Sequence, residues 1–99
     1  MDKIYTIDEI KSISVPIARR YGVKAVYLFG SYARNEADEN SDIDIVIDKG
    51  RIKGLQFVSF ILDLEDEFGK HVDVLTTYGL SDGLRQEIHN DEVLLYTEK

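Results

Sequence analysis

The sequence predicts a small α/β domain of the α+β kind, in which a mixed β-sheet has helices packed against it. Three observations support this fold class. Apolar residues recur at helical spacing over residues 7–20 and 53–68. Residues 24–29 and 42–48 are short runs rich in β-branched and aromatic residues, as strands are. A length of 99 residues allows one hydrophobic core, so we expect a single domain over residues 1–99.

The first helix is expected at about residues 7–20. Thr6 and Glu9 have the spacing of a capping box, in which each side chain accepts a hydrogen bond from the other residue's backbone N–H. Pro16 lies inside the segment and removes one hydrogen bond from the helical ladder. Gly22 is suited to the left-handed conformation that ends many helices.

Two strands are expected on either side of a polar stretch. The first, residues 24–29, ends at Gly30. Residues 31–41 show no sustained apolar period, which predicts a turn with at most a short helix. The second strand, residues 42–48, alternates isoleucine with aspartate or valine, so one of its faces is wholly apolar and points into the core. That face is formed by Ile43, Ile45 and Ile47.

The rest of the chain continues the alternation of helix and strand. We expect an amphipathic helix at about residues 53–68, a short strand at 71–75, a helix capped by Ser81 and ending near residue 89, and a strand at 92–97. The apolar residues that mark the first of these helices are Leu55, Val58, Ile61, Leu64 and Phe68, with Phe57 and Phe60 beside them. Those of the second are Leu84 and Ile88.

The composition disfavours several classes of protein. The chain has no cysteine, which rules out disulfides and thiolate metal sites. No apolar run approaches the roughly 20 residues of a membrane span. The first residues lack the apolar segment of a signal peptide, so we expect a cytoplasmic protein that does not associate with membranes. The formal net charge of -7 disfavours direct binding to nucleic acid, because an acidic surface repels phosphate.

Three aspartates are the main candidates for chemistry. Asp42 and Asp44 point to the same side of their strand, about 6.6 Å apart along it, although a bare Asp-x-Asp also fits a solvated edge strand. Asp73 lies between two valines of the next strand, which we expect to be central in the sheet. Carboxylates that converge on one face raise one another's pKa, and divalent ions bound by their oxygens remove that penalty. Two such ions about 3.5–4 Å apart are the usual arrangement for displacement at phosphorus.

A glycine-serine pair lies just upstream of these acids. Gly30 permits a close approach of a ligand to the backbone, and the Ser31 hydroxyl with exposed N–H groups can bind phosphate oxygens. An EF-hand loop beginning at Asp38 would need Gly and Glu where Ile43 and Lys49 stand, and no turn ends in the Gly-Lys-Ser/Thr of a P-loop. The combination indicates a nucleoside triphosphate that is bound together with divalent cations.

The stretch Gly30-Ser31, ten further residues and then Asp42-Ile43-Asp44 resembles the signature of the DNA polymerase β-like nucleotidyltransferases. The longer stretches FGSYAR…SDIDIVI and VDVLT look like the minimal nucleotidyltransferases (MNT), which in prokaryotes are often antitoxins paired with HEPN-domain toxins. The resemblance runs along nearly the whole chain. It implies the nucleotidyltransferase core fold.

The resemblance also implies a role for each matching aspartate. Asp42 and Asp44 would bind Mg²⁺ that bridges the triphosphate of ATP. Asp73 would help to hold a second ion and favour deprotonation of the acceptor hydroxyl. His71 shares a face with Asp73, where a supporting or surface role fits better than catalysis, since two-metal chemistry needs no histidine.

The outer phosphates would be held by Gly30 and Ser31, which would stabilise the charge that develops there. Arg34 is a further candidate for a phosphate contact and fits a solvated turn arginine equally well. The chain departs from the family at Asn35, where glycine is common. Asparagine tolerates a left-handed backbone better than most residues, so we expect the turn to form.

The activity that the resemblance implies is transfer of AMP from ATP to a tyrosine of a HEPN ribonuclease, which silences that toxin. Larger members of the family carry additional domains for base and acceptor, so we expect a partner protein to supply the acceptor, or part of the pocket, here. One alternative is an antitoxin that neutralises its toxin by binding alone, for which no metal site would be needed. Transfer to a small molecule such as an aminoglycoside is a third reading, which the absence of an acceptor domain disfavours.

Overall fold

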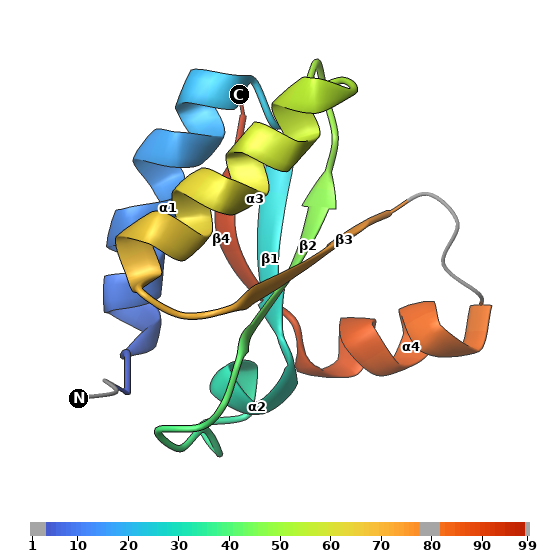
Figure 1. The fold of residues 1–99 in the computed structure, drawn as a ribbon. Coiled ribbons are helices and arrows are strands. Elements are labelled where there is room, and N and C mark those ends of the chain that lie inside the picture. Colours follow the sequence, from blue (N-terminus) through green and yellow to red (C-terminus); the bar gives the residue numbers. More distant parts are fainter. Residues whose placement is uncertain (1–3, 78–81, 99) are drawn as a thin grey trace.

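The computed structural model describes residues 4–77 and 82–98, and it contains the predicted elements in the predicted order (Figure 1). The helices are α1 (Ile7–Tyr21), α2 (Gly30–Ala33), α3 (Leu55–Phe68) and α4 (Asp82–Asp91). The strands are β1 (Ala25–Phe29), β2 (Ile43–Asp48), β3 (Val72–Thr76) and β4 (Val93–Thr97). Most boundaries lie within one or two residues of the predicted ones, and the predicted cap at Ser81 lies outside the described residues. The predicted fold class is confirmed.

The sheet has the strand order β3-β2-β1-β4. β1 pairs with β2 and with β4 in antiparallel fashion, while β2 and β3 are parallel because α3 provides the crossover between them. The prediction that the strand of Asp73 is central is therefore wrong, since β3 is an edge strand. Its short length and its valines fit either position, because one buried face against a helix is enough to explain them.

Helices α1 and α3 lie side by side on one face of the sheet, and the core fills the space between (Figure 1). The predicted apolar face of β2 is confirmed, because its three isoleucines are fully buried in this core. The largest fully buried side chains are Phe60, Ile10, Leu28, Ile43, Ile45, Ile47, Ile52, Leu64, Leu95, Val23, Val26 and Val72. On the opposite face, Ile88 of α4 lines a cleft with Tyr27 and Val46. The aspartates of β2 and β3 also point to this second face.

The buried face of α3 differs from the predicted one. Leu55 and Val58 are 85% and 50% exposed, whereas Phe60, Leu64 and Phe68 are buried. The predicted face begins with Leu55 and Val58 and continues in steps of three residues. Each such step is a rotation of about 300° around the helix axis, so the later residues lie on a different face from the first ones. Phe57, Phe60, Leu64 and Phe68 are spaced by three or four residues, which keeps them on one face of the helix. This face packs against the core.

The ends of α1 are as predicted. Thr6 and Glu9 form both hydrogen bonds of a capping box, each 3.0 Å long. The helix continues through Pro16 and ends at Gly22, which has the left-handed φ of 73°. Among the described residues, no helix combines the length and apolarity needed to cross a membrane.

Candidate active site

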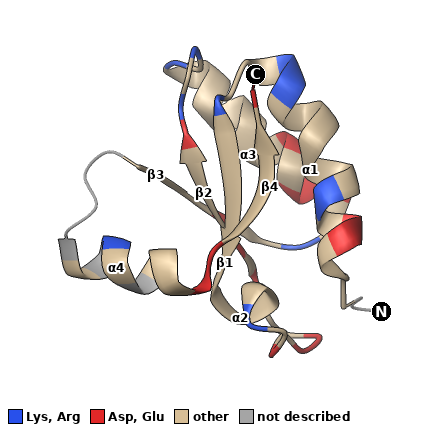
Figure 2. Ribbon diagram, turned by 180° about the vertical axis from the view of Figure 1, so that it is seen from behind, with Lys and Arg blue, Asp and Glu red and all other residues tan. Residues whose placement is uncertain are grey.

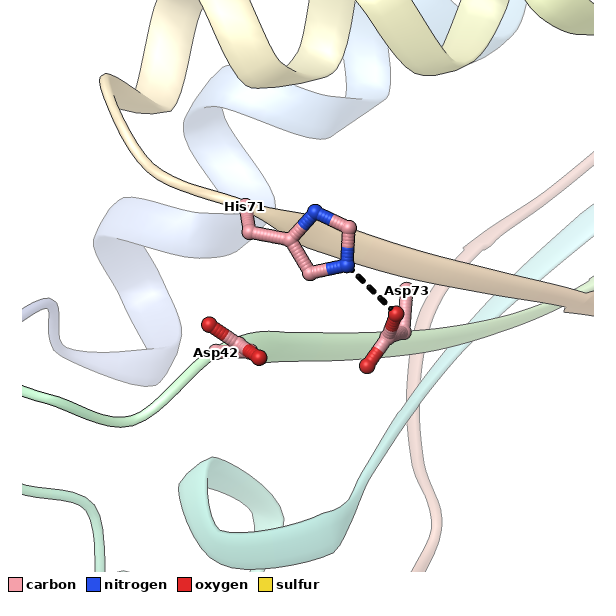
Figure 3. Close-up of side chains that lie close together, drawn as sticks. All are labelled: Asp42, His71 and Asp73. Carbon is pink, nitrogen blue, oxygen red and sulfur yellow. Dashed lines mark hydrogen bonds and ion pairs between the residues drawn. The ribbon is translucent and has the colours of Figure 1, made fainter.

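The parallel pairing of β2 with β3 brings the predicted aspartates together. Asp44 lies directly opposite Asp73 in the register of the two strands, so both side chains are on the same face of the sheet. Asp42 comes immediately before β2. Its carboxylate, that of Asp73 and the imidazole of His71 each offer a ligand atom, and these atoms lie within 4.8 Å of one another (Figure 3). The structure therefore gathers three carboxylates at the end of the sheet where β2 and β3 begin.

Gly30 lies against the Asp44 carboxylate. Phe29 at the end of β1 pairs with Asp44, and the chain then turns into α2 with a φ of 74° at Gly30. A Cβ at this glycine would lie 2.3 Å from Oδ2 of Asp44, so a side chain there would displace this carboxylate. Ser31 follows as the second residue of α2 and is partly buried. The predicted phosphate-binding pair is thus adjacent to the predicted cation-binding residues.

The environment of Asp44 disfavours its ionised form. Burial, and next a hydrogen bond with Asp73, raise the pKa of Asp44 from 3.8 to about 6, and the negative charges of Asp73 and Asp42 act in the same direction. The positive charge of Arg34 opposes this shift. Oxygen ligands with excess negative charge are the donors that hard divalent cations prefer. The residues present therefore fit a divalent cation.

His71 connects this site to α3. Its Nε2 lies 2.7 Å from Oδ1 of Asp73, and its Nδ1 lies 2.9 Å from Oε2 of Glu65. The hydrogen bond with Asp73 raises the pKa of His71, and the charges of Asp73, Asp42 and Glu65 add to this effect, while burial opposes it. Sequence reasoning placed His71 beside Asp73, and the structure confirms this. It missed Glu65, because only the packing of α3 against β3 brings that carboxylate to the imidazole.

Arg34 is held at the edge of the site by two carboxylates. Its Nε lies 3.2 Å from Oε2 of Glu36 and its Nη1 lies 3.3 Å from Oδ2 of Asp91 at the end of α4. These contacts raise the pKa of Arg34, which stays charged. Asn35, next in the chain, has a φ of 61°, so the expected left-handed backbone is confirmed at this position.

Lys70 supports the segment that leads into Asp42, and sequence reasoning missed it as well. Its Nζ donates to the Tyr32 hydroxyl at 3.1 Å and to the backbone carbonyl of Ser41 at 2.8 Å. Tyr32 is buried in the core, so the lysine connects the backbone just before β2 to a side chain that is held in place by packing. Figure 2 shows acidic residues on the loop between α2 and β2.

Comparison with known proteins identifies the family. The profile described as "Polymerase beta, Nucleotidyltransferase" matches residues 11–99. The chain belongs to this family. A relative from Methanocaldococcus jannaschii, whose name refers to protein adenylyltransferase activity, is 46% identical over 88 residues, which are 88% of this chain and 95% of that protein. The protein adenylyltransferase MntA of Thermococcus cleftensis is 34% identical over 93 residues, which are 89% of this chain and 94% of that protein.

A solved structure shows the same fold at lower sequence identity. The structure of a tri-AMPylated Shewanella oneidensis HEPN toxin in complex with its MNT antitoxin matches with a TM-score of 0.71 and 19% identity, over 94% of this chain and 74% of that chain. The predicted nucleotidyltransferase core is therefore confirmed in both sequence and fold, and the chain is a nucleotidyltransferase.

Proposed function

We propose that this nucleotidyltransferase transfers AMP from ATP to a tyrosine of a HEPN-domain ribonuclease and thereby acts as an antitoxin. The observation that carries the proposal is the convergence of the Asp42, Asp44 and Asp73 carboxylates beside a glycine turn where a side chain would displace Asp44. The two relatives bear the name of protein adenylyltransferases, and the similar structure is a complex with an AMPylated HEPN toxin. The names of the relatives support a protein acceptor, and the similar structure supports a HEPN toxin as that acceptor.

Asp42, Asp44 and Asp73 would hold the divalent cations, which we take to be two Mg²⁺ ions. When bound, these ions supply neutralisation of the triphosphate charge and polarisation of the α-phosphoryl group. The raised pKa of Asp44 is consistent with this role, because burial and the neighbouring carboxylates disfavour its ionised form when no cation is present.

Gly30 and Ser31 would hold the outer phosphates. The missing side chain at Gly30 lets the triphosphate approach the backbone next to Asp44, and the Ser31 hydroxyl can donate to a phosphate oxygen. Arg34 would add a positive charge at the rim, if a phosphate replaces one of its two carboxylate partners. These donors would stabilise the charge that develops as pyrophosphate leaves.

In the reaction, the tyrosine oxygen attacks the α-phosphorus of ATP and forms a new P–O bond. The bond from the α-phosphorus to the bridging oxygen of the β-phosphate breaks, and that oxygen leaves with pyrophosphate. Asp73, whose side chain is half exposed on the edge strand β3, would favour loss of the tyrosine proton. The acceptor can approach this edge because the Asp73 side chain is half exposed.

The test is to incubate the protein with ATP, Mg²⁺ and the product of the adjacent reading frame, which we expect to be the HEPN protein. Intact mass spectrometry should show adenylate added to the HEPN protein, and its ribonuclease activity should fall. Asp44→Asn should abolish the transfer. A stable complex without any change in the mass of the HEPN protein would overturn the proposal and favour neutralisation by binding alone.

A further inference from the structure

Glu65, His71 and Asp73 form a series of polar contacts from α3 to the acidic end of the sheet, with an ion pair between Glu65 and His71 and a hydrogen bond between His71 and Asp73. The imidazole has one nitrogen 2.9 Å from Glu65 Oε2 and the other 2.7 Å from Asp73 Oδ1. Figure 3 shows the hydrogen bond from the His71 ring to the Asp73 carboxylate, with Asp42 nearby, just before the neighbouring strand β2. These contacts therefore connect α3, a helix that packs on the core, to Asp73, a candidate metal ligand.

The Asp73 carboxylate needs a neighbouring side chain to fix its orientation more than the Asp44 carboxylate does. β3 is an edge strand, and the Asp73 side chain is 50% exposed. Asp44 lies on a central strand and is confined by the backbone of Gly30. An exposed aspartate without a fixed partner samples several rotamers, and the entropy of that freedom opposes binding in any one geometry.

Glu65 in turn gives His71 a fixed support. The same oxygen that faces the imidazole also accepts a hydrogen bond from the backbone N–H of Val72, 3.1 Å away. The Glu65 side chain is only 28% exposed and Val72 is buried. Because both ring nitrogens have a carboxylate partner, the ring has one preferred orientation. Supporting contacts of this kind around metal ligands commonly change metal affinity or activity 10- to 100-fold when they are removed, as a rough guide.

We propose that His71 is a positioning residue for the transfer reaction: supported by Glu65, it fixes the orientation of the Asp73 carboxylate. The inference rests on the proposed function. The orientation of Asp73 affects the reaction because, in that function, this carboxylate binds a cation and favours loss of the proton from the acceptor tyrosine. It adds two residues to the site, neither of which contacts the substrate.

The experiment compares His71→Ala with His71→Gln, whose amide N–H can still donate to Asp73. His89→Ala is the matched control, because His89 is an exposed histidine paired with a carboxylate, Glu92, at 3.1 Å. We expect His71→Ala to lower kcat for AMP transfer about 10-fold or more with KM for ATP unchanged. The glutamine variant should recover part of the loss, and the control should match the wild type.

Binding of Mn²⁺ without ATP, followed by electron paramagnetic resonance, gives a readout that needs no transferase activity. The affinity for Mn²⁺ should fall about 10-fold in His71→Ala and partly recover in His71→Gln. Glu65→Ala should weaken binding in the same direction, and adding it to His71→Ala should cause little further loss. Circular dichroism of each variant checks that the fold is retained.

Two results would overturn the inference. One is wild-type kcat and wild-type Mn²⁺ affinity in His71→Ala. The other is a nitrogen coupling to bound Mn²⁺ in the wild type that disappears in His71→Ala, which would make His71 a direct ligand. A wild-type protein that binds Mn²⁺ as expected but never modifies the HEPN protein would refute the proposed function instead, and the Mn²⁺ measurements would still decide the role of His71.

Discussion

Gly30 illustrates how much a single residue determines in this site. Its φ of 74° is unfavourable for other residues, and a Cβ there would lie 2.3 Å from Asp44 Oδ2. We expect Gly30→Ala to displace the Asp44 carboxylate and to reduce AMP transfer 100-fold or more, which is on the order of 3 kcal/mol in the barrier. The backbone strain should also lower the free energy of unfolding by about 1–3 kcal/mol. Initial rates and urea denaturation measure the two effects.

Gly69→Ala is the matched control for this variant. Gly69 has a similar φ of 68°, but a Cβ there would meet open space. It should lose a similar amount of stability and keep its activity. Equal transfer rates in the two alanine variants would show that the contact between Gly30 and Asp44 has no part in the reaction.

Asp44 should make the stability of the metal-free protein depend on pH. Its folded pKa of about 6 lies above the ordinary 3.8, so the folded state binds this proton more tightly than the unfolded state does. The resulting stabilisation of the folded state is fully present below pH 3.8 and is lost as the pH rises through about 6. In a chelating buffer, Asp44→Asn should therefore gain stability relative to the wild type between about pH 4 and pH 7. Urea denaturation across that range is the measurement, and a constant difference between the two proteins would contradict it.

At the scale of the elements, α1 contains an avoidable source of instability. Pro16 is exposed inside the helix and cannot donate the backbone hydrogen bond of its position. Pro16→Ala restores that donor, although it also gives the unfolded chain more freedom. We expect the free energy of unfolding to rise by about 1–2 kcal/mol with no change in transfer rate. Thermal denaturation tests this, and a lower melting temperature would mean that the proline fits a distortion that the helix requires.

The elements themselves were largely predictable because their signals are local. The capping box of α1, the glycine after it and the alternation in β2 each depend on residues close in the chain. The prediction was wrong for Leu55 and Val58, which are exposed on α3, and for the central position of β3. Both errors concern the partner against which an element packs. Neither the spacing of apolar residues nor the length of a strand contains that information.

At the scale of the whole molecule, bound cations should stabilise the folded chain. The formal net charge is -7, and the carboxylates at the end of the sheet add a local repulsion that a divalent ion removes. Mg²⁺ at about 100 times its dissociation constant should add about 2.7 kcal/mol to the free energy of unfolding. Asp44→Asn should show little of this gain. Sodium chloride at equal ionic strength controls for general screening, and an equal effect of the two salts would argue against a specific site.

The sequence by itself determined the family and the set of elements, because these depend on residue type and short-range spacing. It also predicted the candidate site residues Gly30, Ser31, Asp42, Asp44 and Asp73. Only the tertiary structure decided that Asp44 faces Asp73 across a parallel strand pair and that Gly30 lies against the Asp44 carboxylate. It also supplied Glu65 and Lys70, whose partners are reached through packing. The physical reason is that a hydrogen bond or a pKa shift depends on distance in space, and the folding of α3 and β3 onto β2 sets those distances.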